Sequence, residues 1–225
     1  MPVDSEFYKN IKEELHNRNV TLVAVSKTKP IEEILELYNL GQTDFGENYV
    51  QELCDKHEHL PHDIQWHFIG HLQSNKVKYI APFVSLIQGV DTKKLLEEIN
   101  KQGEKLNKVI DCLLQVHISD EETKFGFDER ELEELFNSNS LNLSDLNNVR
   151  ICGLMGMASF TNDMNKVRNE FKLLKSLFDK FSILKPVAFG SKFSMLSMGM
   201  SADYKIAIEE GSNVVRIGSL LFGSR

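Results

Sequence analysis

The sequence contains no hydrophobic run that approaches the roughly 20 residues needed to cross a membrane. Its first residues are too polar for a signal peptide. It has only three cysteines, Cys54, Cys112 and Cys152, an odd number without the paired spacing of a metal site, so reduced thiols are the simplest interpretation. We therefore expect a cytoplasmic protein that has no membrane partner and folds without disulfide bonds.

Basic residues are in the minority. The chain has 26 lysines and arginines against 33 aspartates and glutamates, which gives a formal net charge of -7. A general nucleic-acid binder is usually basic, so we expect no nucleic-acid partner, and any anionic ligand must be held by a local site. The 225 residues, with 41% hydrophobic content, are enough to bury a full core in one large domain or two small ones.

Short apolar runs alternate with helical patterns along the chain, which is typical of an α/β fold. The eight candidate strands are residues 21–26, a short run ending near 45, 66–69, 85–90, 108–118, 149–157, either 187–189 or 193–197, and 213–217. These units predict a single TIM (β/α)8 barrel domain over residues 1–225, with an extra N-terminal helix within residues 4–19. A doubly wound open sheet is the alternative. Residues 137–148, rich in Asn and Ser, are interpreted as a surface excursion.

Lys27 follows the first apolar run, just before a helical pattern begins. Because side chains alternate along a strand, Lys27 shares a face with Val23 and Val25. A lysine held among apolar neighbours can act as a nucleophilic amine, which a Schiff base with a carbonyl compound requires. The alternative is a lysine that has just emerged into solvent, and this segment alone does not decide between the two.

The other unusual residues also fall at strand ends, where the active site of a TIM barrel is built. Ser201 follows the seventh strand and precedes an apolar helical face, so we expect an N-cap that could help to bind an anion. Gly218 and Ser219 end the eighth strand and could add donors to the same phosphate site. An ordinary cap with nothing bound is the alternative for Ser201.

Arg216 interrupts the apolar eighth strand. A guanidinium that faces the barrel interior is costly unless something accepts its hydrogen bonds. A ligand could accept them, and so could a carboxylate on a neighbouring strand. A register in which Arg216 faces the helix layer is the third interpretation.

Other chemistries receive less support. Five histidines lie between His57 and His71, but without the spacing of a zinc site, so we predict no metal. We interpret His67 as lining a pocket or the core at a strand end. Acidic pairs lie in predicted helices, mostly on solvated faces, which argues against a two-carboxylate hydrolase. Cys152 precedes a glycine inside a strand and is interpreted as core.

Six blocks follow one another along the sequence, namely residues 23–30, 45–52, 66–76, 153–155, 196–203 and 215–218, the last with 222–223. In this order they resemble the pyridoxal phosphate homeostasis proteins, which are single-domain barrels of fold type III similar to the N-terminal domain of alanine racemase. The resemblance covers nearly the whole chain. Residues 157–160 read Met-Ala-Ser-Phe where many members of the family have a proline, so we expect the loop after the sixth strand to differ in shape.

The resemblance implies a cofactor, pyridoxal 5'-phosphate, and a role for each matching residue. Lys27 would hold the cofactor aldehyde as an internal aldimine, and Arg216 would face the pyridine nitrogen. Ser201 would bind the phosphate together with the backbone of Gly218 and Ser219. The resemblance also places two residues in the lining of the pocket, Asn48 and His67.

The family resemblance implies a protein of vitamin B6 homeostasis that sequesters pyridoxal phosphate and hands it to apoenzymes, with free amino acids as further ligands; we expect a monomer. A low-activity amino-acid racemase is the alternative. A carboxylate opposite the ring nitrogen would favour carbanion chemistry, whereas Arg216 disfavours it. Alanine racemases also use a tyrosine from a C-terminal β domain. We expect no such domain here, because about seven residues follow Gly218, so no residue is assigned as catalytic. A phosphate-sugar enzyme with a Schiff base between Lys27 and its substrate is a third, minor hypothesis.

Overall fold

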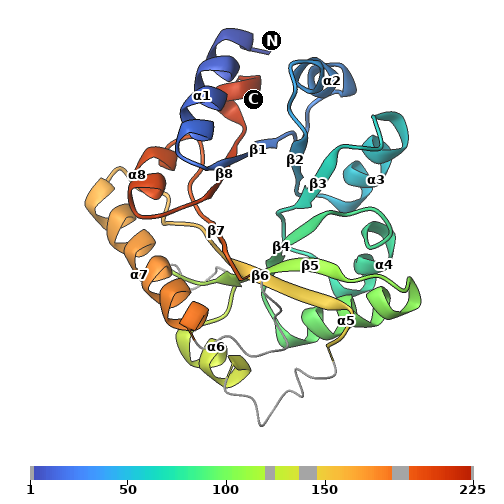
Figure 1. Cartoon of the computed structure of the whole chain (residues 1–225), viewed down its shortest axis with the longest axis vertical. Coiled ribbons are helices and arrows are strands. Elements are labelled where there is room, and N and C mark those ends of the chain that lie inside the picture. Colours follow the sequence, from blue (N-terminus) through green and yellow to red (C-terminus); the bar gives the residue numbers. More distant parts are fainter. Residues whose placement is uncertain (1–2, 120–124, 137–145, 184–192, 224–225) are drawn as a thin grey trace.

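A computed structural model shows the chain as a closed barrel of eight parallel strands surrounded by helices (Figure 1). The structure describes residues 3–119, 125–136, 146–183 and 193–223. Each strand pairs with the next, and the last pairs with the first. The strands are β1 (Thr21–Val25), β2 (Asp44–Glu47), β3 (Gln65–Phe68), β4 (Leu86–Val90), β5 (Ile110–Val116), β6 (Val149–Gly156), β7 (Met195–Ser197) and β8 (Val214–Ile217). The predicted barrel is confirmed, and the open sheet is wrong.

The helices lie outside the strands (Figure 1). They are α1 (Ser5–Asn17), α2 (Ile31–Asn39), α3 (Val50–His59), the 3-10 helix η1 (Ser74–Lys76), α4 (Val77–Ile80), α5 (Lys93–Lys105), α6 (Glu129–Phe136), α7 (Met164–Ile183), α8 (Tyr204–Glu209) and α9 (Ser219–Phe222). The predicted extra helix is α1. It packs beside α9, where the backbone N–H of Asp4 donates to the Leu221 carbonyl at 3.3 Å. No helix of the described ranges combines the length and the apolar character that a membrane span requires.

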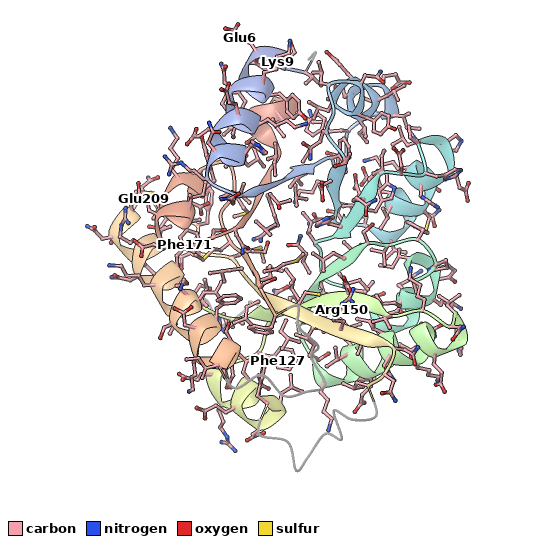
Figure 2. The ribbon with its side chains drawn as sticks, viewed as in Figure 1. Glu6, Lys9, Phe127, Arg150, Phe171 and Glu209 are labelled. Atoms are coloured by element: carbon pink, nitrogen blue, oxygen red, sulfur yellow. The ribbon has the colours of Figure 1, made fainter. Side chains whose placement is uncertain are left out.

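The core has two layers because side chains of each strand alternate between its two faces. Most buried apolar residues pack between the strands and the helices, as Phe171 of α7 does in Figure 2, whereas Lys9 of α1 lies at the surface. A smaller cluster contains Leu113 and Cys152, and the flanking residues of β5 belong to the larger cluster. Cys152 is therefore a core residue, as predicted, and burial raises the pKa of its thiol.

Several predicted boundaries shift by one or two residues. β1 ends at Val25, so Lys27 lies two residues beyond it. The weak seventh strand is Met195–Ser197, and its alternative at 187–189 falls outside the described residues. Most of the predicted surface excursion, residues 137–145, also falls outside them.

The contact between β6 and β7 leaves no room for a side chain at Gly153. A Cβ atom there would lie 1.8 Å from the Met195 carbonyl oxygen. We predict that Gly153→Ala lowers the free energy of unfolding by about 3 kcal/mol, the upper end of the usual cost of overpacking, because β7 must move away. Urea unfolding measures this difference. The control variant Cys152→Ala, which deletes only the sulfur atom of the preceding residue, should lower the free energy of unfolding by less. An unchanged urea midpoint for Gly153→Ala would refute the prediction.

Candidate functional site

A cavity of about 590 Å³ opens at the carboxyl ends of β1, β6, β7 and β8. This is the face on which TIM barrels build their active sites. Five of the seven predicted site residues line it, namely Lys27, Ser201, Arg216, Gly218 and Ser219. The rest of its wall comes from Val25, Lys29, the segment 158–162, Met164, Val167, Met200, Ala202, Asp203 and Gly223. The remaining two predicted residues, Asn48 and His67, are not among the lining residues.

Lys27 reaches the cavity from the turn that follows β1. Its side chain is half-buried and lies beside Val25, as the strand alternation predicts. A second amine of the cavity, Lys29, donates to the carbonyl oxygen of Phe222 at 2.7 Å and lies 3.6 Å from Glu33. The ammonium group of Lys29 is thus tied to the far end of the chain, next to α9.

Ser201 lies opposite the end of β8. Its hydroxyl oxygen accepts a hydrogen bond from the backbone N–H of Gly218 at 3.3 Å, which joins the loop after β7 to the loop after β8. The prediction that Ser201 caps a helix is wrong, because α8 begins only at Tyr204 with Asp203 as its N-cap. Asp203 accepts from the backbone N–H of Met200 at 2.6 Å, and this turn places Ser201 ahead of the helix.

Arg216 forms the floor of the cavity and is only 3% exposed. Its guanidinium points inward and donates to the Ser197 hydroxyl at 2.5 Å and to the Gly156 carbonyl at 3.0 Å. Among the described residues both hydrogen-bond partners are neutral oxygens, so the predicted alternatives of a carboxylate on a neighbouring strand and of a register facing the helices are not observed. Burial lowers the pKa of Arg216 to about 10, against the charge of Asp203, and the group stays charged at pH 7.

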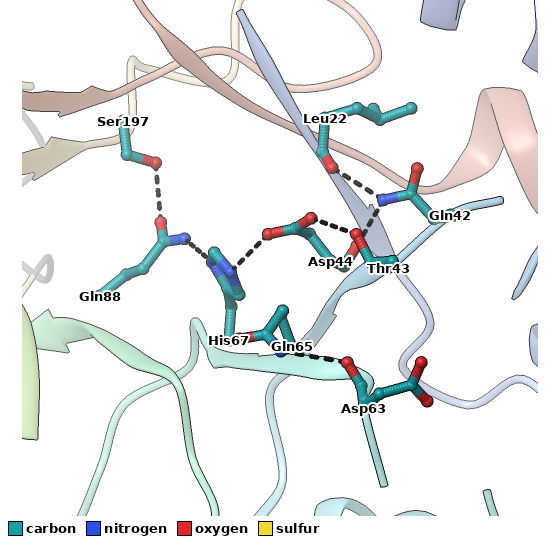
Figure 3. A network of polar contacts seen from close by, with 9 residues as sticks. All are labelled: Leu22, Gln42, Thr43, Asp44, Asp63, Gln65, His67, Gln88 and Ser197. Atoms are coloured by element: carbon teal, nitrogen blue, oxygen red, sulfur yellow. Dashed lines mark hydrogen bonds and ion pairs between the residues drawn. The ribbon is translucent and has the colours of Figure 1, made fainter. Parts of the chain in front are cut away.

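A chain of hydrogen bonds begins at Arg216, which donates to Ser197. Figure 3 shows the rest of this chain, from Ser197 to Asp44. The Ser197 hydroxyl donates to Gln88 Oε1 at 2.7 Å, and Gln88 Nε2 lies 2.9 Å from His67 Nδ1. His67 Nε2 lies 3.2 Å from Asp44 Oδ1, at the start of β2. Burial raises the pKa of the Asp44 carboxyl, but the hydrogen bond and charge of His67 and the bond from Thr43 outweigh it, and the net pKa is lowered. The chain thus begins at a cation and ends at an anion.

His67 and Asn48 occupy other places than the predicted pocket lining. His67 is a buried member of this chain and reaches the cavity only through Gln88, Ser197 and Arg216. Asn48 lines a separate cavity of about 620 Å³ beside α3. Direct contact of either residue with a cofactor therefore stays a prediction.

The sequence analysis missed several polar residues of the site. Ser197 contacts Arg216, and Asp203 orders the loop that carries Ser201. Ser159 lines the cavity, and both its backbone N–H and its hydroxyl donate to Glu170 of α7 at 2.6 Å. Ser197 ends the predicted seventh strand, and Ser159 and Asp203 follow the sixth and seventh, which was a usable signal. The spacing of Ser197 and Arg216, 19 positions apart on neighbouring strands, gave no sign of their contact.

The histidine cluster forms no metal site in the part of the chain that the structure describes, where no group of three or more His, Cys, Asp or Glu side chains could hold an ion. His57 instead stacks on Phe83, with ring centroids 3.8 Å apart, and meets His62 edge-on. Burial and the neighbouring His62 lower the pKa of His57.

The direction of the hydrogen-bond chain predicts the tautomer of His67. Because the Ser197 hydroxyl donates to the amide oxygen of Gln88, the amide nitrogen must donate to His67, which leaves Nδ1 unprotonated and the proton on Nε2. Nitrogen NMR of labelled protein measures this directly. The isosteric variant Gln88→Glu, whose carboxylate only accepts, should move a proton onto Nδ1. Nδ1 protonated in the wild type, or no change in the variant, would contradict the assignment.

Comparisons with known proteins agree on one family. The family model described as alanine racemase, N-terminal domain, matches residues 6–225. The pyridoxal phosphate homeostasis protein of Aquifex aeolicus is 45% identical over 205 residues, which cover 91% of this chain and 86% of that protein. The human protein of the same name is 39% identical over 217 residues, 91% of this chain and 76% of the relative.

Solved structures extend the comparison. PipY of Synechococcus elongatus with pyridoxal phosphate bound has a TM-score of 0.84 and 33% identity, and the match covers 97% of this chain and 99% of PipY. Alanine racemase of Bartonella henselae, at 16% identity and a TM-score of 0.71, shares the fold over 99% of this chain and 60% of the racemase. The chain belongs to the pyridoxal phosphate homeostasis protein family.

Proposed function

We propose that this protein binds pyridoxal 5'-phosphate in the cavity at the end of the barrel and acts in cellular pyridoxal phosphate homeostasis. One observation carries the proposal: Lys27, Arg216 and the Ser201 loop meet in a single cavity of about 590 Å³. That volume lies within the ~300–1,000 Å³ of small-molecule sites. The names of the relatives and the PipY structure with this cofactor support the same conclusion.

Each chemical part of the cofactor has a suitable residue in the cavity. Lys27 supplies the amine that would hold the aldehyde. The hydroxyls of Ser201 and Ser219, with the backbone N–H groups of the loop after β8, would hold the phosphate. Arg216 would lie at the pyridine nitrogen as a donor, held in place by Ser197 and the Gly156 carbonyl. The residues therefore fit the cofactor.

The charge of Arg216 favours storage over catalysis. When bound, pyridoxal phosphate supplies an aldehyde that reacts with amines and a ring that can accept electrons. Arg216 keeps its proton at pH 7, since its pKa is about 10. A guanidinium can only donate to the ring nitrogen and so disfavours the protonated ring, which is the strong electron acceptor. We infer that the site retains the cofactor without activating it.

Beyond binding, we propose that the protein works in the cytoplasm as a monomer. It would sequester the reactive aldehyde on Lys27, exchange it with free amino acids and transfer it to apoenzymes. The half-buried position of Lys27 at the mouth of the barrel is consistent with both retention and exchange.

A low-activity amino-acid racemase remains the second candidate, because the cavity has the same amine and the chain has the fold of the alanine racemase barrel. Racemisation needs a second acid-base group on the opposite face of Cα. The titratable side chains in the described lining of the cavity are Lys27, Lys29, Asp203 and Arg216. Lys29 is bonded to Phe222, and Asp203 to Met200, so neither is poised for that role.

The assignment of Lys27 can be tested by chemical capture. We expect borohydride reduction of the protein loaded with pyridoxal phosphate to leave a phosphopyridoxyl group on Lys27, because Lys27 supplies the reacting amine. Peptide mass spectrometry locates the group. Lys27→Met should lose the label and remain folded, and Lys29→Met, which removes the other amine of the cavity, should retain it. Label on Lys29 or Lys76 in the wild type would overturn the assignment.

The choice between storage and racemisation has a direct measurement. We expect Cα deuterium incorporation from D₂O into L- and D-alanine, and into a panel of other amino acids, to stay far below that of a dedicated racemase. General acid-base catalysis typically accelerates a reaction ~100 to 10,000-fold. Among the described residues that line the cavity, none is placed to act as the second acid-base group. A spectral shift on adding alanine shows exchange on Lys27 and does not count as turnover. Exchange at enzyme-like rates that Lys27→Met abolishes would favour the racemase.

A further inference from the structure

The turn that carries Lys27 has a strained backbone. Lys29 closes it through a hydrogen bond from its N–H to the Ser26 carbonyl at 3.0 Å, and Thr28 has φ of +62°. A β-branched residue in the left-handed region is an outlier, and such a conformation persists only where surrounding contacts enforce it. Some part of the structure must therefore hold Thr28 in place.

A buried lysine, Lys56 of α3, lies directly behind this turn and is 5% exposed. Its ammonium group donates to three oxygens, those of the Ser26 carbonyl at 2.7 Å, Glu47 Oε1 at 2.7 Å and Glu52 Oε1 at 2.6 Å. An ammonium group has three N–H donors, so all of them are used. Lys56 thereby joins β1, β2 and α3.

The two carboxylates bond to the residues on either side of Lys27. The Ser26 hydroxyl donates to Glu47 Oε1 at 2.6 Å, and the strained Thr28 donates its backbone N–H to Glu52 Oε1. The backbone on both sides of Lys27 is thus bonded to one cluster of charges, formed by Glu47, Glu52 and Lys56.

Burying the charges of this cluster costs free energy, so the cluster is not explained by a gain in stability. The Glu47 side chain is fully buried, and its second oxygen, Oε2, has no hydrogen-bond partner among the described residues. Burial raises the pKa of the Glu47 carboxyl, although Lys56 and Ser26 act against it. Apolar residues of similar volume commonly stabilise a protein as well as a buried ion pair does. A function in placing Lys27 explains why the charges are there.

We propose that Glu47, Glu52 and Lys56 are positioning residues that hold the turn so that the Lys27 amine faces the cofactor aldehyde. None of the three lines the cavity, so they act through the Ser26 carbonyl and hydroxyl and the Thr28 backbone N–H. The inference rests on the proposed function. Its consequence is selective: the cluster governs covalent capture by Lys27, while the phosphate and ring are held by other residues.

The test compares two ligands that differ only at the reacting carbon. Pyridoxal 5'-phosphate has the aldehyde, and pyridoxine 5'-phosphate has an alcohol in its place. We expect Lys56→Met and Glu52→Ala to lower the affinity for pyridoxal phosphate about tenfold or more in equilibrium dialysis. This is the effect of losing one hydrogen bond to a charged group. Binding of pyridoxine phosphate should change by less than about twofold.

Two control variants separate positioning from a general loss of structure. Lys108 also has a partly buried ammonium, bonded to the carbonyls of Ala81 and Pro82 at 2.9 and 3.1 Å before β5, so Lys108→Met should leave both ligands unaffected. Ser201→Ala should lower the affinity for both ligands equally, because both carry the phosphate group.

Each remaining outcome is decisive. If Lys56→Met and Glu52→Ala lower the affinity for both ligands equally, or lower neither, the positioning role is overturned. The proposed function is unaffected by either result. Wild-type protein that binds neither ligand would overturn the proposed function itself. If Lys56→Met fails to fold, Glu52→Ala carries the test, since the Glu52 side chain is 22% exposed and its removal disturbs the core less.

Discussion

The parallel pairing of the first and last strands is the contact on which the candidate site depends. β1 and β8 lie in register with Val23 opposite Arg216 and Ala24 opposite Ile217. A Cβ atom at Gly218 would lie 3.1 Å from the Val25 carbonyl oxygen, so the two strand ends leave little room for a side chain between them. Because the strands are parallel, this pairing brings the start of the chain, with Lys27, beside the loop after β8. The amine proposed for covalent capture and the residues proposed for phosphate binding after β8 thereby line one cavity, although they lie about 190 positions apart.

Buried charges near the site reduce the stability of the fold, and the apolar layer between strands and helices compensates for them. Arg216 is buried with two neutral partners, and Lys56 is buried with two carboxylates. Buried charges contribute little net stability or reduce it. The layer between strands and helices, which contains most of the buried apolar side chains, compensates for them through hydrophobic burial. The buried charges of the candidate site are therefore tolerated because the outer core supplies the stability.

The sequence predicted the fold well because the barrel depends on local patterns. Short apolar runs marked all eight strands, and the strand ends pointed to Lys27 and Arg216. Contacts between residues far apart in the chain could not be predicted from the sequence. The bond between Ser197 and Gln88 joins residues 109 positions apart and depends on which side chains face the interior. Glu52 and Lys56 are recognisable as a helical i, i+4 pair, but Glu47 becomes their partner only once the end of β2 lies next to α3. The predicted Ser201 cap is wrong for a local reason, since residues 201–203 form a turn and α8 begins only at Tyr204.

The central claim is that pyridoxal 5'-phosphate binds in the cavity with its aldehyde on Lys27. A crystal structure determined after soaking crystals with this cofactor tests the claim most directly, because it shows all parts of the cofactor at once. The account predicts electron density continuous with the Lys27 side chain, the phosphate against Ser201, Gly218 and Ser219, and the ring nitrogen facing Arg216. Phosphate density in the separate cavity that Asn48 lines, or cofactor joined to Lys29 with Lys27 unmodified, would contradict it.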